Sequence, residues 1–126
     1  MLELQLKGLS SPDLPGLEDR PADARQTIIA VSAGIGSETS PGADQFLISV
    51  CTPAWLERHL DGHAHRFGRG LLIVKVFDWK VVTTALEDLV SQIQVETWEQ
   101  AVTELSRFGL AWEFEGVRPM PGGTAE

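Results

Sequence analysis

TWEQAVTELSRFGLAWEFE, residues 97–115, contains a helix start, a helix stop and an amphipathic strand in one continuous run. Thr97 is a typical N-cap residue, and Gln100 stands where the partner of a capping box reaches back. Apolar residues then recur at helical spacing as far as Phe108, and Gly109 follows at the position that favours a left-handed C-cap. The stretch therefore predicts a helix that ends at one glycine and returns into a strand.

After this glycine the period changes from helical to alternating. Leu110, Trp112 and Phe114 share one side of the predicted strand, and the intervening residues, which include Glu113 and Glu115, share the other. A strand with one apolar face must join a sheet, and the helix before it should pack on that sheet.

The rest of the chain adds further strands and helices. Strands are expected at 2–7, 27–33, 45–51 and 71–76, and helices at 53–61 and 78–93. The two middle strands, joined by a flexible connection at 34–43, should form an antiparallel hairpin, and the apolar run at 71–76 should be central. This order predicts an α+β fold: a mostly antiparallel sheet of about five strands with about three helices packed on one face. We expect one domain at 1–116 and a flexible tail at 117–126.

Composition limits the class of protein. The mean hydropathy of -0.02 is that of a globular chain, and no apolar run approaches the roughly 18 residues of a membrane span. The N-terminus lacks the basic and apolar regions of a secretory signal. Cys51 is the single cysteine, so no internal disulfide can form, and a reducing cytoplasm fits.

The balance of acidic and basic residues indicates which kinds of partner the protein can bind. There are 18 acidic and 10 basic residues, which give a formal net charge of -8. This balance argues against nucleic acid, because phosphate binding depends on lysine and arginine. It is compatible with a basic protein partner, and equally with a charge that serves solubility alone.

Three histidines, His59, His63 and His65, form the strongest metal candidate. His59 and His63 have the four-residue spacing of zinc ligands on a helix, but Gly62 interrupts the helix between them. Surface or helix-capping histidines are the favoured interpretation. We therefore expect no metal and no cofactor, with a metal-binding enzyme as a weaker alternative.

Other residues offer weaker chemistry. Cys51 precedes a predicted helix N-terminus, where a thiol can become reactive, although a buried structural cysteine is commoner. Gly34 and Gly36 lack the third glycine and the helix of a phosphate loop. Glu113 and Glu115 are spaced as paired carboxylates, but a solvated strand face explains them better. Trp55, Trp98 and Trp112 fall on predicted core faces, so we interpret them as structural.

Three segments in order resemble one known family. They are VCTPAWLERHL at 50–60, LLIVKVFDW at 71–79 and TWEQAVTELSRFGLAWEFE at 97–115, and the opening strand followed by Ser11-Pro12-Asp13 also fits. The chain resembles the immunity protein 8 family of bacterial polymorphic toxin systems. The most specific matches are the TPxWL pattern that begins at Thr52 and the terminal WEFE.

The resemblance implies a cytoplasmic antidote that binds the toxin domain encoded beside it and has no catalysis of its own. Its charge suits a basic toxin such as a nuclease. We expect the acidic sheet face and its flanking loop to make the contacts, through Glu3, Asp13, Glu18, Glu113 and Glu115. The alternatives are a small binding or assembly module unrelated to toxins, and the metal-binding enzyme. Either a monomer or a homodimer is compatible with the sequence.

Overall fold

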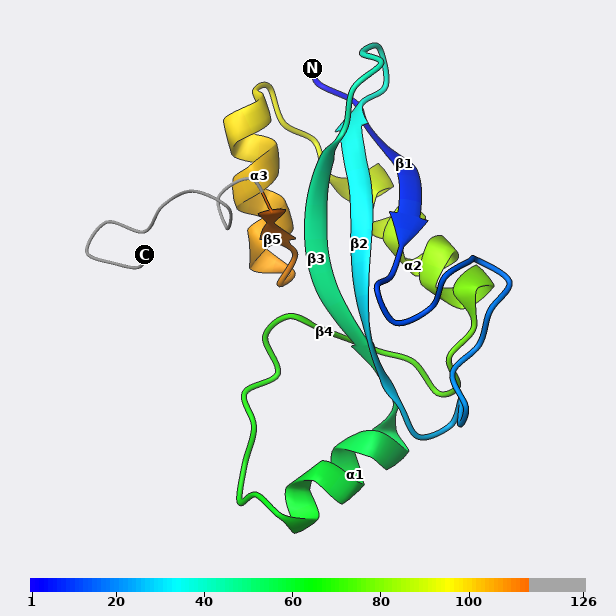
Figure 1. Ribbon diagram of the computed structural model, residues 1–126. Coiled ribbons are helices and arrows are strands. Elements are labelled where there is room, and N and C mark those ends of the chain that lie inside the picture. The colour runs from blue at the N-terminus through cyan, green and yellow to red at the C-terminus, as the bar shows by residue number, and fades with distance from the viewer. Residues whose placement is uncertain (114–126) are drawn as a thin grey trace, which may run out of the picture.

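The computed structural model describes residues 1–113, which form a five-stranded sheet and three helices (Figure 1). In chain order the elements are β1 (Leu4–Ser10), β2 (Ile28–Ser37), β3 (Asp44–Cys51), α1 (Pro53–Asp61), β4 (Leu71–Ile73), α2 (Trp79–Gln92), α3 (Trp98–Arg107) and β5 (Ala111–Trp112). The strand order is β1-β2-β3-β4, with β5 also paired to β3. The β3–β4 pair is parallel and the others are antiparallel, so the predicted α+β class is confirmed.

The β2–β3 hairpin is the centre of the sheet. Its register places Ile29 opposite Val50, Val31 opposite Ile48 and Ala33 opposite Phe46, and all six side chains are buried. The predicted hairpin is confirmed, but its flexible connection is shorter than expected. Residues 34–37 belong to β2, because their backbone pairs with β1 on the other side. The tip is therefore 38–43.

The first strand, β1, begins later than predicted and contains a bulge at Lys7. The Lys7 ammonium group donates to the carbonyl oxygens of Ser40 and Gly42, so this side chain holds the hairpin tip. Leu2 forms an isolated bridge with Val95, which ties the N-terminus to the segment between α2 and α3.

The apolar run at 71–76 is not a central strand, and this prediction was wrong. Only residues 71–73 pair, along one edge of β3, and Ile73 is 55% exposed. The run is apolar for a different reason: Val74 is buried in the core just after the strand ends. The chain then turns away, and Phe77 donates its backbone N–H to the carbonyl of Ala24.

Two helices cover one face of the sheet. Residues of α2 and α3, among them Val82, Leu86 and Leu105, belong to the same buried cluster as the inward residues of β2 and β3. In Figure 1, α2 passes behind β1 and β2, and α3 lies beside β3 and behind β5. Local capping fixes their starts, because Asp78 accepts from the Lys80 N–H and Thr97 completes the predicted capping box.

The first helix, α1, lies beyond the end of the sheet (Figure 1). The sequence spacing of Trp55, Leu56 and Leu60 predicts that they form a buried side of this helix. That prediction is wrong, because α1 has no buried residue and Leu60 is 43% exposed. The interpretation of Trp55 as a core residue was wrong for the same reason. Trp98 and Trp112 are half-buried and pack against the core, in agreement with their predicted side.

Some expectations lie outside the described residues. These are the tail at 117–126, Phe114 and Glu115. Within residues 1–113, no helix has the length and apolar character needed to cross a membrane.

Candidate functional site

The face of the sheet opposite α2 and α3 carries no helix within the described chain (Figure 1). None of the residues that the strand register places on it is charged. Besides glycines, the residues on this face include Gln5, Ser10, Ile28, Ala30, Ser32, Gln45, Leu47, Ser49, Leu71 and Ile73. Ser32 and Gln45 hydrogen bond to each other at 2.8 Å. We call this surface the uncovered face.

A hollow of about 360 Å³ lies on the uncovered face. Its floor includes Leu47 and Leu71, and two exposed arginines, Arg66 and Arg69, belong to its lining. Both arginines come from the segment that connects α1 to β4. In a chain of net charge -8, the hollow therefore combines a neutral floor with positive charge.

Backbone packing positions Arg69. The next residue, Gly70, has a φ of 81° and lies against Gly109, whose φ is 92°. Arg69 itself donates from one guanidinium nitrogen to the carbonyl oxygen of Ser106 at 3.2 Å and to its hydroxyl at 3.1 Å. The last turn of a helix favours a cation, so this contact also stabilises the end of α3.

Aromatic stacking positions Arg66. Its guanidinium lies 5.4 Å from the centre of the Trp55 ring, which continues into a stack with His59 and His63. Desolvation lowers the pKa of His59, and the nearby charges of His63 and Arg66 lower it further. Phe67, the residue after Arg66, is 84% exposed.

The stack argues against the metal alternative. The rings of His59 and His63 are 4.2 Å apart and nearly parallel, so their in-plane nitrogen lone pairs do not converge. His63 Nδ1 lies 2.8 Å from the His59 carbonyl oxygen, and His65 contacts Phe67 edge to face. Among residues 1–113, no three His, Cys, Asp or Glu side chains form a group that would hold a metal ion.

The cysteine and the two glycines considered as reactive or phosphate-binding residues occupy positions where they serve the fold. Cys51 is fully buried, and burial raises the pKa of its thiol although Arg66 acts in the opposite direction. Gly34 and Gly36 lie inside β2 rather than in a phosphate loop. A Cβ atom at Gly36 would overlap the Gly42 carbonyl oxygen, so the glycine permits the tip to fold back.

The acidic residues expected to bind a partner are dispersed. The Glu3 carbonyl accepts from the Glu38 N–H at the hairpin tip, whereas the Asp13 carboxylate accepts from the Ala30 N–H at 2.9 Å. Ala30 in β2 and Glu38 just after it are eight residues apart, which corresponds to about 26 Å along a strand. Glu18 is exposed in the loop after β1.

The last two acidic residues predicted to bind a partner are Glu113 and Glu115, at the end of the described chain and beyond it. Glu113 directly follows β5 and is half-buried, and Glu115 lies outside the described residues. Alternation in the sequence also predicts that Lys7 lies on the polar face, but its ammonium group is held by the hairpin tip. The uncovered face is consequently neutral rather than acidic, and the structure does not gather the predicted contacts into one cluster.

Negative charge is concentrated in the helical layer instead. Residues 81–106 contain no lysine, arginine or histidine, and their acidic residues are Glu87, Asp88, Glu96, Glu99 and Glu104. Two of these carboxylates have a cationic partner: Glu104 pairs with Arg107 at 3.1 Å, and Glu96 with the N-terminal amine at 3.8 Å. The absence of basic residues from 81–106 can be read from the sequence alone. The prediction of partner contacts used the strands and the loop after the first strand, and did not consider this stretch.

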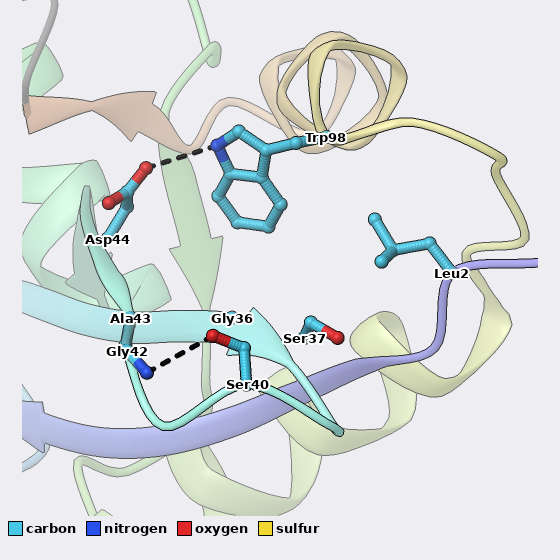
Figure 2. Close-up of a pocket in the computed structure, with 8 residues that line it drawn as sticks. All are labelled: Leu2, Gly36, Ser37, Ser40, Gly42, Ala43, Asp44 and Trp98. Atoms are coloured by element: carbon cyan, nitrogen blue, oxygen red, sulfur yellow. Dashed lines mark hydrogen bonds between the residues drawn. The ribbon is translucent and has the colours of Figure 1, made fainter.

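A second hollow, of about 500 Å³, lies between the hairpin tip and α3 (Figure 2). Trp98 borders it on the helix side, and Leu2, Ser37 and Ser40 border it elsewhere. Asp44 Oδ2 accepts from the indole N–H groups of both Trp98 and Trp112, each at 3.1 Å. The carboxylate beside this hollow therefore joins β3, α3 and β5, which is a structural role.

The strands of the uncovered face contribute no charge, and the hollow on this face exposes apolar side chains beside two arginines. Such a surface is typical of proteins that bind other proteins. A sequence model of one family, described as Immunity protein 8, matches residues 4–116. The chain therefore belongs to the immunity protein 8 family, and the resemblance seen in the sequence is confirmed. No curated protein and no solved structure matches the chain.

Proposed function

We propose that this chain is a cytoplasmic immunity protein of a bacterial polymorphic toxin system. It binds the toxin domain encoded beside it, one to one, and blocks that domain without catalysis. The observation that carries the proposal is the family match over residues 4–116, since immunity proteins of this family are generally non-catalytic. The functional unit proposed is a single domain at 1–116 with a flexible tail at 117–126.

Charge supports a basic toxin, for example a nuclease. The net charge of -8 and the acidic helical layer produce a field that attracts a basic partner from a distance. Such steering raises the association rate more than it raises the final affinity. Binding should therefore slow as salt is added, because a Debye length of about 8 Å at physiological ionic strength screens distant charges.

Glu3, Asp13, Glu18, Glu113 and Glu115 remain predicted contacts. Glu3, Asp13 and Glu18 are exposed, and these three lie at different places on the molecule. Asp13 also accepts a hydrogen bond from β2, so its replacement would affect both the fold and binding. Glu3→Lys and Glu18→Lys are therefore the cleaner tests of this set.

The proposal is tested by co-expression with the C-terminal domain of the protein encoded immediately upstream. We expect this chain to protect cells from that domain, to co-purify with it, and to bind a catalytically inactive form in a one-to-one calorimetric titration. Light scattering of the free chain would distinguish a monomer from a homodimer.

Absence of both protection and binding would remove the proposal for that pair. The alternative, a binding or assembly module unrelated to toxins, would then be favoured, and its partner would have to be found by other means. Protection without binding would instead contradict the blocking mechanism, because a stoichiometric inhibitor must form the complex.

A further inference from the structure

The centre of the uncovered face has the composition of an interface core. Leu47 is 43% exposed in the middle of β3, and its neighbours in the hollow include Ala30, Leu71 and Ala111. Interface cores are depleted of charge, and exposed apolar patches of this kind mark interaction sites. The helical layer differs, because its exposed surface carries the carboxylates.

The charged groups that line the hollow are both guanidinium groups, those of Arg66 and Arg69, and no carboxylate lines it within the described chain. Arg69 uses one of its nitrogens on Ser106, and Arg66 places its guanidinium group over the Trp55 ring. An arginine has five N–H donors, so both retain donors for a ligand. These donors match the two oxygens of a carboxylate in a bidentate pair.

We propose that this hollow anchors the toxin domain through a segment that sets an apolar side chain on Leu47 and a carboxylate against Arg66 and Arg69. The inference rests on the proposed function and adds the docking surface and the chemistry of the contact. The occupant is a protein segment, because the floor of the hollow is apolar and its ionisable rim is two arginines rather than a convergent polar set for a small molecule.

Charge elsewhere on the chain makes this contact selective. The carboxylates on the exposed part of the helical layer repel an acidic residue of the partner. Arg66 and Arg69 attract it, so such a residue binds at the hollow rather than on the helices. A partner that lacks the carboxylate would leave two guanidinium groups partly desolvated in the complex. The long-range field then brings a basic domain near, and the hollow selects its orientation.

Calorimetry with the inactive upstream-encoded domain tests the anchor. Leu47→Glu and Arg66→Glu should each raise Kd by roughly tenfold or more, as for residues at the centre of an interface. Arg66→Lys keeps the charge but loses the planar fork, so an intermediate Kd is expected. Circular dichroism melts would establish that each variant is folded, and Leu47→Gln replaces Leu47→Glu if the latter does not fold.

Matched control variants lie on the helical side. Val81 is 48% exposed on α2, close to the value for Leu47, so Val81→Glu introduces the same charge on a similar surface. Lys80→Glu makes the same reversal as Arg66→Glu at the start of α2. Both controls should change Kd by less than about twofold, because exposed positions outside an interface have small effects.

A charge exchange tests the carboxylate itself. One Asp→Arg or Glu→Arg change in the toxin domain should recover binding to Arg66→Glu and weaken binding to the wild-type chain. Wild-type binding with unchanged Kd for Leu47→Glu and Arg66→Glu would overturn the anchor while keeping the proposed function. If the wild-type chain itself neither binds nor protects, both proposals fail for that pair.

Discussion

Gly70 and Gly109 pack backbone against backbone, which joins the segment before β4 to the end of α3. Both residues have positive φ values, 81° and 92°, in the region that glycine adopts without strain. A Cβ atom at Gly109 would lie 2.7 Å from the Cα atom of Gly70. This approach places Arg69 beside Ser106, so it also shapes the hollow on the uncovered face.

Gly109→Ala should destabilise the protein. The positive φ alone costs a residue with a side chain about 1–3 kcal/mol, and the overlap with Gly70 adds to this cost. Urea denaturation followed by tryptophan fluorescence would measure the loss. Gly68→Ala is the matched control, because a Cβ atom there meets nothing within 4 Å and its φ is not positive. Equal stabilities of the two variants would contradict the close packing.

Asp44→Ala should also destabilise the fold, through two tryptophans at once. The variant removes the carboxylate that accepts from the Trp98 and Trp112 indoles. A hydrogen bond to a charged group contributes about 1.5–3 kcal/mol, so a loss of at least that size is expected. Asp44→Asn keeps one carbonyl acceptor and should lose less. A red shift of native tryptophan fluorescence in Asp44→Ala would accompany the loss.

Local signals in the sequence were sufficient for the helices and the hairpin. Thr52, Asp78 and Thr97 each cap a helix where a capping residue was recognisable, and Gly109 ends α3 as predicted. These features depend on residues within one turn of each other. The inward face of β3 was predictable as well, because large apolar residues recur at every second position, Phe46, Ile48 and Val50.

Burial on a larger scale was not predictable in the same way. The pattern of Trp55 and Leu60 fits a helix with a buried side, but α1 lies beyond the end of the sheet and none of its residues is buried. Alternation placed Glu3 and Glu113 on the uncovered face, yet each lies just outside a paired strand. Arg66 was overlooked because it belongs to a connection with no periodicity.

Thr52→Val should loosen the junction between β3 and α1. Thr52 is fully buried, and its hydroxyl accepts from the N–H groups of Trp55 at 3.4 Å and Thr27 at 3.1 Å. Valine has nearly the same shape but leaves both donors without this acceptor, so a loss of about 1–2 kcal/mol is expected. Thr103→Val is the control, since that exposed hydroxyl donates only to a carbonyl of its own helix. Chemical denaturation of both variants gives the comparison.

Cys51 should be unreactive in the native protein. Its side chain is buried, and the raised pKa of the thiol keeps the thiolate fraction low at neutral pH. A thiol reagent such as dithionitrobenzoate should therefore react at the rate of unfolding, and quickly in concentrated urea. Rapid stoichiometric reaction in native buffer would restore the reactive interpretation of this cysteine.

His59 should make the stability of the fold depend on pH. Its folded pKa is lowered below the ordinary 6.5, first by burial and then by the charges of His63 and Arg66. Between the folded and unfolded pKa values the unfolded chain binds more protons, so stability falls as pH decreases through this window. Well above 6.5 the ring is almost entirely neutral in both states, so its contribution to the slope disappears.

His59→Gln should flatten this part of the pH dependence, which thermal melts between pH 5 and pH 8 would record. A proton NMR titration measures the group directly: its midpoint should lie below 6.5. In Arg66→Gln the midpoint should move back toward 6.5, because one of the nearby positive charges is gone. A wild-type midpoint at or above 6.5 would contradict the lowered pKa of His59.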